Sequence, residues 1–460
     1  MLRSDSTIAA ISTAPGASGI GIVRISGPDA FFIAEKVFHP KNKEKRIKEQ
    51  KSHTIHYGWI FDQEQPVDEV LLMLMKAPHT YTGEDTIEID CHGGIYSTRR
   101  VLETVVKAGA RISEPGEFTK RAFLNGRMDL SQAESVMDVI EAKNENALKS
   151  SLKHLRGMVY SKIENIRERL LYEIAYIESA LDDPEHYSLD NYQESLKHTI
   201  DDIINEIVKL LSRSQNGKLI REGIRTVIVG KPNAGKSSLM NLLTGEEKAI
   251  VTDIAGTTRD ILDEYINLNG ISLHLIDTAG IRKTDDYVEK IGVEKAIQAA
   301  DDADLTLFVM DSSTEPDDND RYILKLLNDK NVIILYNKTD LAPKVTIEEI
   351  QMDSSHKVIP VSMKEETGIE ELEREITEMF FKGNIAVNDE LYITNERQMN
   401  ALKDCVECLR LVQNGIQDQL PEDFLSIDLR DACDCLGYIT GETVGEDLVE
   451  EIFSRFCMGK

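Results

Sequence analysis

The sequence has no apolar stretch long enough to cross a membrane, and its longest apolar runs, such as 70–75, have the length of a buried strand. A bilayer requires about 20 consecutive apolar residues, so we expect no membrane-spanning helix and no membrane partner. The first 20 residues also lack the basic start and apolar block of a secretory signal, and they lack the arginines of a transit peptide. A cytoplasmic location is therefore expected.

Cysteine is scarce, with six residues in a chain of 460. The spacings Cys405-x2-Cys408 and Cys433-x-Cys435 invite a zinc interpretation. However, the first pair falls within a helical pattern that has no turn residues of a zinc knuckle, and Cys-x-Cys is an uncommon zinc spacing. We therefore expect reduced, partly buried thiols.

Positive charge is also in short supply, because 53 Lys and Arg face 81 Asp and Glu and leave a net charge of −28. Such a chain repels nucleic acid on average. Any RNA contact must use a local basic patch. The segment 41–51 is one candidate, although a solvated hairpin loop explains it equally well, and a second consists of Lys149, Lys153, His154 and Arg156.

What the sequence does contain is the pattern of a multidomain α/β protein. Its 41% hydrophobic and 29% charged residues are typical of soluble proteins, and its length allows several cores. Residues 1–118 are predicted to be α+β, 119–220 helical, 221–382 a parallel α/β domain of alternating strands and helices, and 383–460 helical again. We therefore predict an α/β domain inserted in one helical domain.

The predicted elements follow apolar periodicity. Residues 163–181 carry apolar side chains at three- and four-residue steps, which predicts one long helix ended by Asp182-Asp183-Pro184. Strands are predicted at 7–11, 19–25, 53–60, 69–75, 86–91, 224–229, 273–276, 305–310, 332–336 and 358–361, and further helices at 30–37, 96–106, 188–212, 390–412, 426–436 and 446–456.

One stretch organises the chain, because Gly230-x4-Gly235-Lys236-Ser237 follows a predicted strand and opens a predicted helix. Glycines allow backbone N–H groups to turn around an anion, and the helix presents its positive end to it. Lys236 then supplies a charge for the β- and γ-phosphates, while the Ser237 hydroxyl can ligate Mg²⁺. The stretch predicts a nucleotide phosphate site.

Three further segments follow in the order typical of GTPases, and they are Asp277-Thr-Ala-Gly280, Asn337-Lys-Thr-Asp340 and Ser362-Met-Lys364. Asp277-Thr-Ala-Gly280 comes after a strand, where it can reach the Mg²⁺ shell and the γ-phosphate. The carboxylate of Asp340 can accept guanine N1–H and N2–H, which adenine does not offer, so ATP should be rejected. The predicted GTP-binding residues are Asn233, Ala234, Gly235, Lys236, Ser237, Ser238, Thr252, Asp253, Ile254, Ala255, Gly256, Thr257, Thr258, Asp277, Thr278, Ala279, Gly280, Asn337, Lys338, Thr339, Asp340, Ser362, Met363 and Lys364.

The residue that orients the attacking water is not in the usual place. Ras-like GTPases use a glutamine directly after the Asp-x-x-Gly motif, but this chain has Ile281, which cannot orient water. Glu289, or another acidic residue of 283–290, is the candidate. Asn233 adds a neutral oxygen near the phosphates, suited to a monovalent cation.

Several sequence blocks resemble one family along the whole chain. They are Gly21-Ile-Val-Arg-Ile-Ser-Gly27, Tyr81-Thr-Gly-Glu-Asp85, Cys91-His-Gly-Gly94, Glu114-Pro-Gly-Glu-Phe118, Arg121-Ala-Phe-Leu-Asn125 and Phe456-Cys-Met-Gly-Lys460. Together with the nucleotide motifs, these blocks resemble the MnmE (TrmE) family of bacterial tRNA modification GTPases. Met458 stands where the family usually has isoleucine, leucine or valine, a swap that conserves volume.

The resemblance implies a Ras-like P-loop GTPase domain and a tetrahydrofolate-binding-like amino-terminal domain that holds a homodimer. It implies Mg²⁺ at Ser237 and Thr258, and K⁺ at Asn233, Thr252, Ile254 and Thr257. It implies water orientation by Glu289, and switch coupling by Arg259, Asp260 and Arg282. It also implies binding of a one-carbon tetrahydrofolate, 5-formyl or 5,10-methylene, at Arg24, Glu88, Arg127 and Lys460.

By the same resemblance, an FAD-dependent MnmG-like protein is the partner, in a heterotetramer, and tRNA is the substrate. The product carries an aminomethyl or carboxymethylaminomethyl group on C5 of wobble uridine U34. Cys457 matches the near-terminal cysteine of the family, whose thiolate can act as a nucleophile or hold a reactive carbon.

Two other interpretations stay open at this point. A ribosome-assembly GTPase would have the same nucleotide motifs and no one-carbon chemistry. A tRNA scaffold would leave all of the chemistry to its partner. Arg24 and Cys457 favour the one-carbon interpretation, since a plain assembly factor has no need for them.

Overall fold

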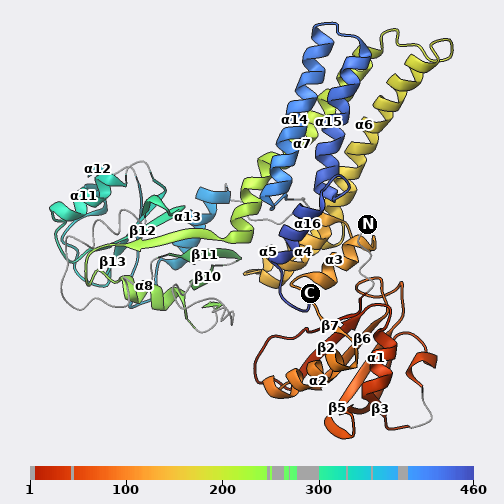
Figure 1. Ribbon diagram of the computed structural model, residues 1–460. Helices are drawn as coiled ribbons and strands as arrows, with labels where there is room; N and C mark the ends of the chain where they lie inside the picture. The colour runs from red at the N-terminus through yellow and green to blue at the C-terminus, as the bar shows by residue number, and fades with distance from the viewer. Residues whose placement is uncertain are drawn as a thin grey trace. The chain divides into compact units, whose positions relative to one another are not determined.

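The computed structural model describes residues 6–42, 46–245, 249–250, 264–268, 270–276, 300–327, 330–353, 356–381 and 392–460. The chain divides into two compact units (Figure 1). Unit 1 comprises Met1–Met137, His154–Lys197 and Glu407–Lys460, and unit 2 comprises Asp138–Lys153 and His198–Val406. The domain boundaries predicted at 118, 220 and 382 stay predictions. Within the described ranges, no helix is both long and apolar enough to span a bilayer.

Unit 1 contains a seven-stranded sheet in the order β3-β4-β5-β6-β2-β1-β7. All neighbours are antiparallel except β1 and β7, which pair in parallel. Helices α1 and α2 pack on this sheet. The elements are β1 (Ile8–Ile11), β2 (Ile20–Ser26), α1 (Ala30–Val37), β3 (Phe38–Pro40), the 3₁₀ turn η1 (Ile47–Glu49), β4 (Thr54–Asp62), β5 (Gln65–Met75), β6 (Thr86–His92), α2 (Ile95–Ala108) and β7 (Arg111–Ile112).

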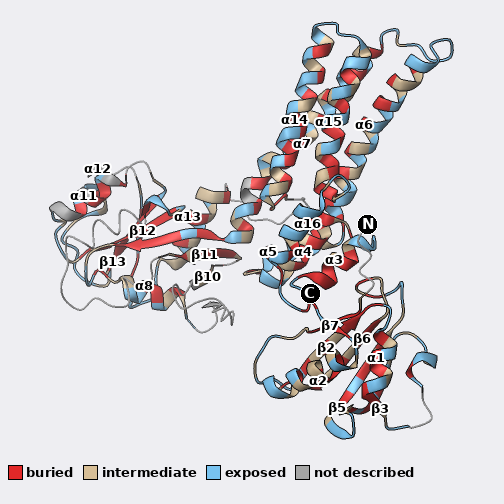
Figure 2. Cartoon of the chain, viewed as in Figure 1, coloured by how far each residue is buried: buried red, intermediate tan, exposed pale blue. Residues whose placement is uncertain are grey.

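The two faces of this sheet differ because strand side chains alternate. On β6, Ile87 and Ile89 are fully buried in the core beneath α1 and α2, whereas Glu88 and Asp90 between them are only partly buried. The alternation continues on β4, where Ile55, Tyr57 and Trp59 are exposed and the residues between them are buried. Figure 2 colours each residue by its burial. Large apolar side chains at Ile20, Ile55, Tyr57, Trp59 and Leu71 are 41–60% exposed.

The helical part of unit 1 begins where the sheet ends. It contains α3 (Glu117–Leu124), α6 (Met158–Asp182), α15 (Glu422–Thr440) and α16 (Glu446–Ser454). The apolar stripe predicted for 163–181 lies on α6, which packs along α15, and the helix ends at Asp182 as predicted. Helices α4 (Leu130–Glu141), α5 (Glu145–Leu155), α7 (Tyr192–Glu222) and α14 (Glu396–Gln417) have residues in both units.

Unit 2 contains the second sheet, in the order β14-β13-β12-β8-β11-β10-β9. Five strands from β14 to β11 are parallel, and β10 and β9 extend this sheet in antiparallel pairing. The elements are β8 (Ile224–Val229), α8 (Lys236–Leu243), β9 (Ala249–Ile250), β10 (Glu264–Leu268), β11 (Ile271–Leu275), β12 (Leu305–Asp311), α11 (Asp318–Leu326), β13 (Val332–Asn337), α12 (Ile347–Asp353), β14 (Lys357–Pro360) and α13 (Ile369–Phe381).

Helices cover both faces of the second sheet, which explains why its central strands β12 and β13 are buried along nearly their whole length. Along β12, Leu307 and Val309 join a core with side chains of α8 and α13. Phe308 and Met310 point the other way and join a core with side chains of α11 and α12. This arrangement brings the carboxyl ends of β8, β12, β13 and β14 to one edge of the sheet, where ligands bind in doubly wound folds.

The strongly periodic elements match the predictions, and the differences have local causes. The helix predicted from 390 is wrong in its start, because residues 392–395 are not helical and α14 begins at Glu396. The side chain of Asn395 accepts a hydrogen bond from the Arg397 amide at 2.9 Å, which is a helix N-cap. The sheet of unit 2 is mixed rather than wholly parallel, and the prediction missed the edge strands β3, β7 and β9 as well as β10, which lies between β11 and β9.

Candidate functional sites: a nucleotide pocket and a polar cluster at the carboxyl terminus

The phosphate loop is the turn between β8 and α8. Gly230 and Gly235 have φ angles of 148° and 110°, a backbone conformation that residues other than glycine rarely adopt. A Cβ at Gly235 would lie 2.1 Å from Nδ2 of Asn337, and one at Gly230 would lie 2.3 Å from the carbonyl of Val309. Both glycines are therefore required for the loop to pass close to its neighbouring strands.

Lys236 begins α8 and turns its side chain back over the loop. Its Nζ donates hydrogen bonds to the carbonyls of Gly230 and Lys231, at 2.7 and 2.6 Å. Burial lowers the pKa of Lys236, because a desolvated ammonium group lacks its water shell. A partly desolvated cation above a glycine loop suits the β- and γ-phosphates of a nucleotide.

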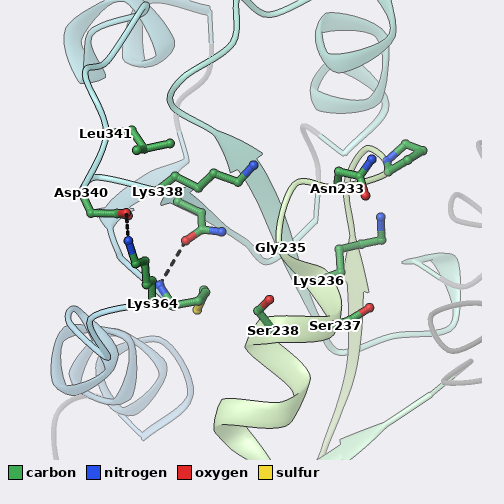
Figure 3. Close-up of a pocket in the computed structure, with 12 residues that line it drawn as sticks. Asn233, Gly235, Lys236, Ser237, Ser238, Lys338, Asp340, Leu341 and Lys364 are labelled. Carbon is green, nitrogen blue, oxygen red and sulfur yellow. Dashed lines mark hydrogen bonds and ion pairs between the residues drawn. The ribbon is translucent and has the colours of Figure 1, made fainter.

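The opposite wall of the pocket comes from the segments after β13 and β14 (Figure 3). Asn337 joins the two walls, since its Nδ2 donates to the carbonyl of Ala234 at 2.7 Å and its Oδ1 accepts from the Met363 amide at 3.3 Å. The carboxylate of Asp340 accepts from the Ser362 hydroxyl at 2.9 Å, and Lys364 Nζ lies 3.9 Å from its other oxygen. These bonds hold the Asp340 carboxylate at the pocket.

Lys338 and Thr339 are tied to the protein. Lys338 Nζ lies 2.6 Å from Oδ2 of Asp311, the last residue of β12. Burial would raise the pKa of Asp311, but hydrogen bonds from Lys338 and Ser313 outweigh it and lower that pKa. The Thr339 hydroxyl donates to the carbonyl of Val361 at 3.0 Å. Both contacts stabilise the loop from which Asp340 projects.

The pocket between these walls has a volume of about 500 Å³, a size suited to a nucleotide. Ten of the 24 residues predicted to bind GTP line it, namely Asn233, Gly235, Lys236, Ser237, Ser238, Asn337, Lys338, Asp340, Met363 and Lys364. The lining also includes Pro232 and Leu341, which were not predicted to bind GTP. Ala234 and Ser362 lie behind this lining, with only 2% and 1% of their surface exposed. The remaining predicted residues of 252–289 lie outside the described residues, and they are Thr252, Asp253, Ile254, Ala255, Gly256, Thr257, Thr258, Arg259, Asp260, Asp277, Thr278, Ala279, Gly280, Arg282 and Glu289.

A second polar cluster lies in unit 1, on the partly exposed face of its sheet. Arg24 on β2 and Glu88 on β6 are cross-strand partners, and Arg24 Nε lies 2.7 Å from Oε1 of Glu88. Their side chains are only 14% and 16% exposed. A carboxylate and a guanidinium at this depth form a defined recognition element rather than a loose surface pair.

Two aromatic rings border this ion pair. The guanidinium of Arg24 lies 5.3 Å from the ring centroid of Tyr81 and 5.6 Å from that of Phe118. Arg127, an exposed residue, places its guanidinium 4.8 Å from the same Tyr81 ring. The structure therefore brings Arg24, Glu88 and Arg127 around Tyr81, and the prediction gave Tyr81 and Phe118 no role.

The carboxyl-terminal residues complete the cluster. The carbonyl of Gly459 accepts from Arg24 Nη1 at 3.3 Å and from the Ser12 hydroxyl at 3.2 Å. A Cβ at Gly459 would lie 2.3 Å from the carbonyl of Ile11, so only glycine fits. The backbone oxygen of Lys460 accepts from the Phe118 amide at 3.2 Å, at the start of α3. The last two residues thus dock on both the sheet and α3.

Lys460 carries a perturbed amine. Burial lowers its pKa, the charge of Arg24 lowers it further, and Glu88 and Cys457 oppose this shift. All four of these residues therefore belong to one electrostatic cluster. An anion beside Lys460 would restore the favourable environment of the ammonium form.

The thiols differ sharply in exposure. Cys457 is exposed in the terminal loop, whereas Cys91 on β6 is buried and burial raises its pKa to about 12. Cys405 and Cys433 are buried within α14 and α15. Across the part of the chain that the structure describes, no three His, Cys, Asp or Glu side chains form a group able to hold a metal ion.

The sequence matches two family models, the MnmE helical domain over residues 130–457 and the GTP-binding protein TrmE N-terminus over residues 7–127. The tRNA modification GTPase MnmE of Lachnoclostridium phytofermentans is 55% identical over 454 residues, and that of Acetivibrio thermocellus is 49% identical over 459 residues. Each alignment covers 99% of both chains. This chain belongs to the MnmE family of tRNA modification GTPases.

Among solved structures, the G domain of the T. maritima FeoB iron transporter is 28% identical, with a TM-score of 0.26 over 34% of this chain and 97% of that one. The MnmE assignment rests on the sequence relatives and the family models alone. It confirms the predicted family and the predicted class of activity, a GTP-hydrolysing enzyme of tRNA modification.

Proposed function

We propose that this MnmE-family chain works with an FAD-dependent MnmG-like partner. The pair adds an aminomethyl or carboxymethylaminomethyl group to C5 of the wobble uridine U34 in certain tRNAs. A one-carbon tetrahydrofolate, 5-formyl or 5,10-methylene, supplies the bridging carbon. The observation that carries this proposal is the cluster in which Arg24 and Glu88 meet Gly459 and Lys460.

The residues of this cluster suit a folate. Oε1 of Glu88 accepts from Arg24, and no described residue donates to Oε2, so that oxygen can accept N–H groups of a pterin ring. Arg127 and Lys460 supply cations for the carboxylates of the folate tail. Tyr81 and Phe118 add aromatic surface next to Arg24. Arg24, Glu88, Arg127 and Lys460 are therefore proposed as the folate-binding residues.

Cys457 stands three residues before Lys460 and is exposed. The backbone carbonyl of Cys457 accepts a hydrogen bond from the Lys460 amide at 3.3 Å, so Cys457 belongs to the same terminal loop as Lys460. A thiolate in this place can attack uridine C6 or hold a reactive carbon. We propose that Cys457 takes a direct part in the modification.

In the nucleotide pocket, we propose that Mg²⁺ is held by Ser237 and Thr258, and K⁺ by Asn233 with Thr252, Ile254 and Thr257. Oxygen ligands of this kind suit both hard cations. Glu289 orients the attacking water, and Arg259, Asp260 and Arg282 couple hydrolysis to modification. Of these residues, Ser237 and Asn233 line the pocket, and the others lie outside the described residues.

We propose that GTP hydrolysis drives a switch, because the nucleotide pocket and the one-carbon cluster lie in different units. The protein is proposed to be a cytoplasmic homodimer that forms a heterotetramer with the flavin partner. Its exposed apolar row on the unit 1 sheet, Ile20, Ile55, Tyr57, Trp59 and Leu71, suits a second copy. The proposed domains are 1–118, the two helical parts 119–220 and 383–460, and the GTPase domain 221–382.

The experiment is a reconstituted reaction with the purified chain, an MnmG-like flavoprotein, unmodified tRNA, GTP and an amine donor. Mass analysis of tRNA nucleosides should detect the modified uridine when 5,10-methylene-tetrahydrofolate is present. The product should be absent when either the folate or GTP is left out. Formation of the same product without any folate would refute the one-carbon part of the proposal.

A further inference from the structure

The connection between β12 and α11 forms ion pairs with two segments that line the nucleotide pocket. At one end, Asp311 binds Lys338, which lies beside Asp340. At the other end, Lys231 of the phosphate loop places its Nζ 2.7 Å from Oδ2 of Asp317 and 2.5 Å from Oδ2 of Asp320. One acidic connection therefore contacts both walls of the pocket.

The Lys231 ammonium points towards the carboxylates at the start of α11. Its neighbours Pro232 and Asn233 line the pocket, but Lys231 does not. The side chain of Lys231 is 28% exposed and that of Asp320 only 7%. Burial would lower the pKa of Lys231, but the hydrogen bonds with Asp317 and Asp320 raise it above its ordinary value. The contact with Asp320 is thus partly shielded from solvent, whereas the Asp317 side chain is 53% exposed.

The two carboxylates are themselves fixed by the start of α11. The Asp317 amide donates to Oδ2 of Asp320 at 3.2 Å, and the Asp320 amide donates to Oδ1 of Asp317 at 3.1 Å. This reciprocal pattern caps a helix, and negative charge is favoured at a helix N-terminus. The Lys231 ammonium therefore pairs with two carboxylates that the start of α11 holds in place.

The backbone carbonyl of Lys231 contacts the side chain of Lys236, the lysine of the phosphate loop. This carbonyl accepts a hydrogen bond from Lys236 Nζ at 2.6 Å. If the loop shifted at Lys231, this carbonyl would move and the Lys236 amine, which is expected to bind the phosphates, would move with it. An amine displaced in this way makes weaker charge-assisted contacts with the phosphates, which lowers the affinity for the nucleotide.

We propose that Lys231, Asp317 and Asp320 form a brace that holds the phosphate loop in its nucleotide-binding conformation. They are positioning residues for GTP binding, since they act through the loop and do not touch the nucleotide. Asp311 and Lys338 secure the opposite wall from the same connection.

The alternative is that Lys231 binds phosphate directly in the GTP complex. The substitution Asp320→Asn distinguishes the two, because asparagine keeps an oxygen to cap the Asp317 amide but loses the charge. If the brace matters, D320N weakens GTP and GDP binding about tenfold, with faster dissociation of a fluorescent GDP analogue. If Lys231 binds phosphate directly, removal of an acidic competitor tightens binding instead.

The matched control is Asp301→Asn, which removes the same charge from an exposed pair with Lys330 in the same unit. Its nucleotide affinity should equal that of the wild type. Lys231→Met should weaken binding like D320N, whereas Lys231→Arg should restore it because the ion pair remains. Steady-state hydrolysis should show a raised KM with kcat little changed.

Circular dichroism of each variant checks that the chain is folded. Should D320N fail to fold, Asp317→Asn gives the same comparison, because asparagine keeps an oxygen for the Asp320 amide and removes the other carboxylate that pairs with Lys231. Unchanged or tighter binding of GTP by folded D320N or K231M would overturn the proposal.

Discussion

Asp340 is held with one carboxylate oxygen on the Ser362 hydroxyl, and its side chain is 10% exposed at the edge of the pocket. A carboxylate in this setting accepts two N–H groups of guanine, while adenine offers no matching donors. We therefore propose that guanine selectivity depends on the Asp340 carboxylate, which Ser362 holds in place at the pocket.

The substitution Asp340→Asn tests that property. Asparagine presents one donor and one acceptor, which matches the altered edge of xanthine. We expect GTP affinity to fall by roughly 10- to 100-fold, the cost of losing charge-assisted hydrogen bonds, while xanthosine triphosphate gains affinity. Competition between the two nucleotides measures the change, and an undiminished preference for GTP would argue against this role of Asp340.

A second residue-scale prediction concerns Lys460 and pH. Burial and Arg24 lower the pKa of its amine, so the amine loses its proton at a lower pH than an exposed lysine does. An anionic folate tail binds the protonated form. Folate affinity should therefore fall as pH rises through the lowered pKa, at a lower pH than it would with an exposed lysine. Calorimetric titrations over the alkaline range measure this, and Lys460→Gln should bind weakly with a flat profile.

At the scale of elements, α3 links the sheet of unit 1 to the carboxyl terminus. Arg121, whose side chain is 4% exposed, pairs with Glu117 at 2.9 Å and Glu84 at 3.0 Å. Burial would raise the pKa of Glu117, but hydrogen bonds from Arg111, the Glu114 amide and Arg121 lower it. The stability from Glu117 is therefore present above the ordinary glutamate pKa and lost as pH falls through the lowered value.

Substitution of Arg121 by methionine should destabilise this element strongly. It leaves Glu84 and Glu117 short of a buried cation, which costs about 3 kcal/mol in free energy of unfolding. Trp59 on β4 is the one tryptophan in the sequence, so its fluorescence reports urea unfolding of this sheet alone. The control Arg99→Met breaks an exposed i,i+4 pair, worth about 0.5 kcal/mol or less. Equal midpoints for the two variants would contradict the network's importance.

Elements were predictable where the periodicity is long. The buried positions of α6 repeat at helical spacing over 25 residues, and β13 has a continuous apolar run from Val332 to Tyr336. Edge strands such as β7 and β9 have two residues each and form only because a partner strand supplies hydrogen bonds. Neither the helix cap at Asn395 nor such pairings leave a strong periodic signal.

The candidate sites also combine residues that were predicted from the sequence with contacts that were not. Lys236 and Asp340 belong to local motifs, so the sequence predicted them. The Asp311–Lys338 pair was missed, because it depends on the register of β12 and β13. The contact between Ser12 and Gly459 joins residues 447 positions apart, and no local pattern marks it.

At the scale of the whole molecule, the nucleotide pocket and the proposed folate site are built from different parts of the chain. The pocket uses strands and loops of 224–364 in unit 2, whereas the cluster joins β2, β6 and α3 with the terminal residues in unit 1. The two chemistries can therefore be disturbed separately.

The substitution Cys457→Ser uses this separation. GTP hydrolysis should remain near the wild-type rate, because the thiol belongs to the other unit. Modification of tRNA should fall sharply in the reconstituted reaction, since serine is a much weaker nucleophile. Parallel assays of phosphate release and modified uridine measure both, and full modification by this variant would show that the thiol is dispensable.

The central claim, a folate site at the carboxyl terminus of this GTPase, is tested most directly by calorimetric titration of the purified chain with 5-formyl-tetrahydrofolate. We predict saturable binding that Glu88→Gln weakens about tenfold through loss of a charge-assisted acceptor. Asp340→Asn, which alters only the nucleotide pocket, should leave folate binding intact. Absence of binding to the wild-type protein, or equal affinity in Glu88→Gln, would contradict the account.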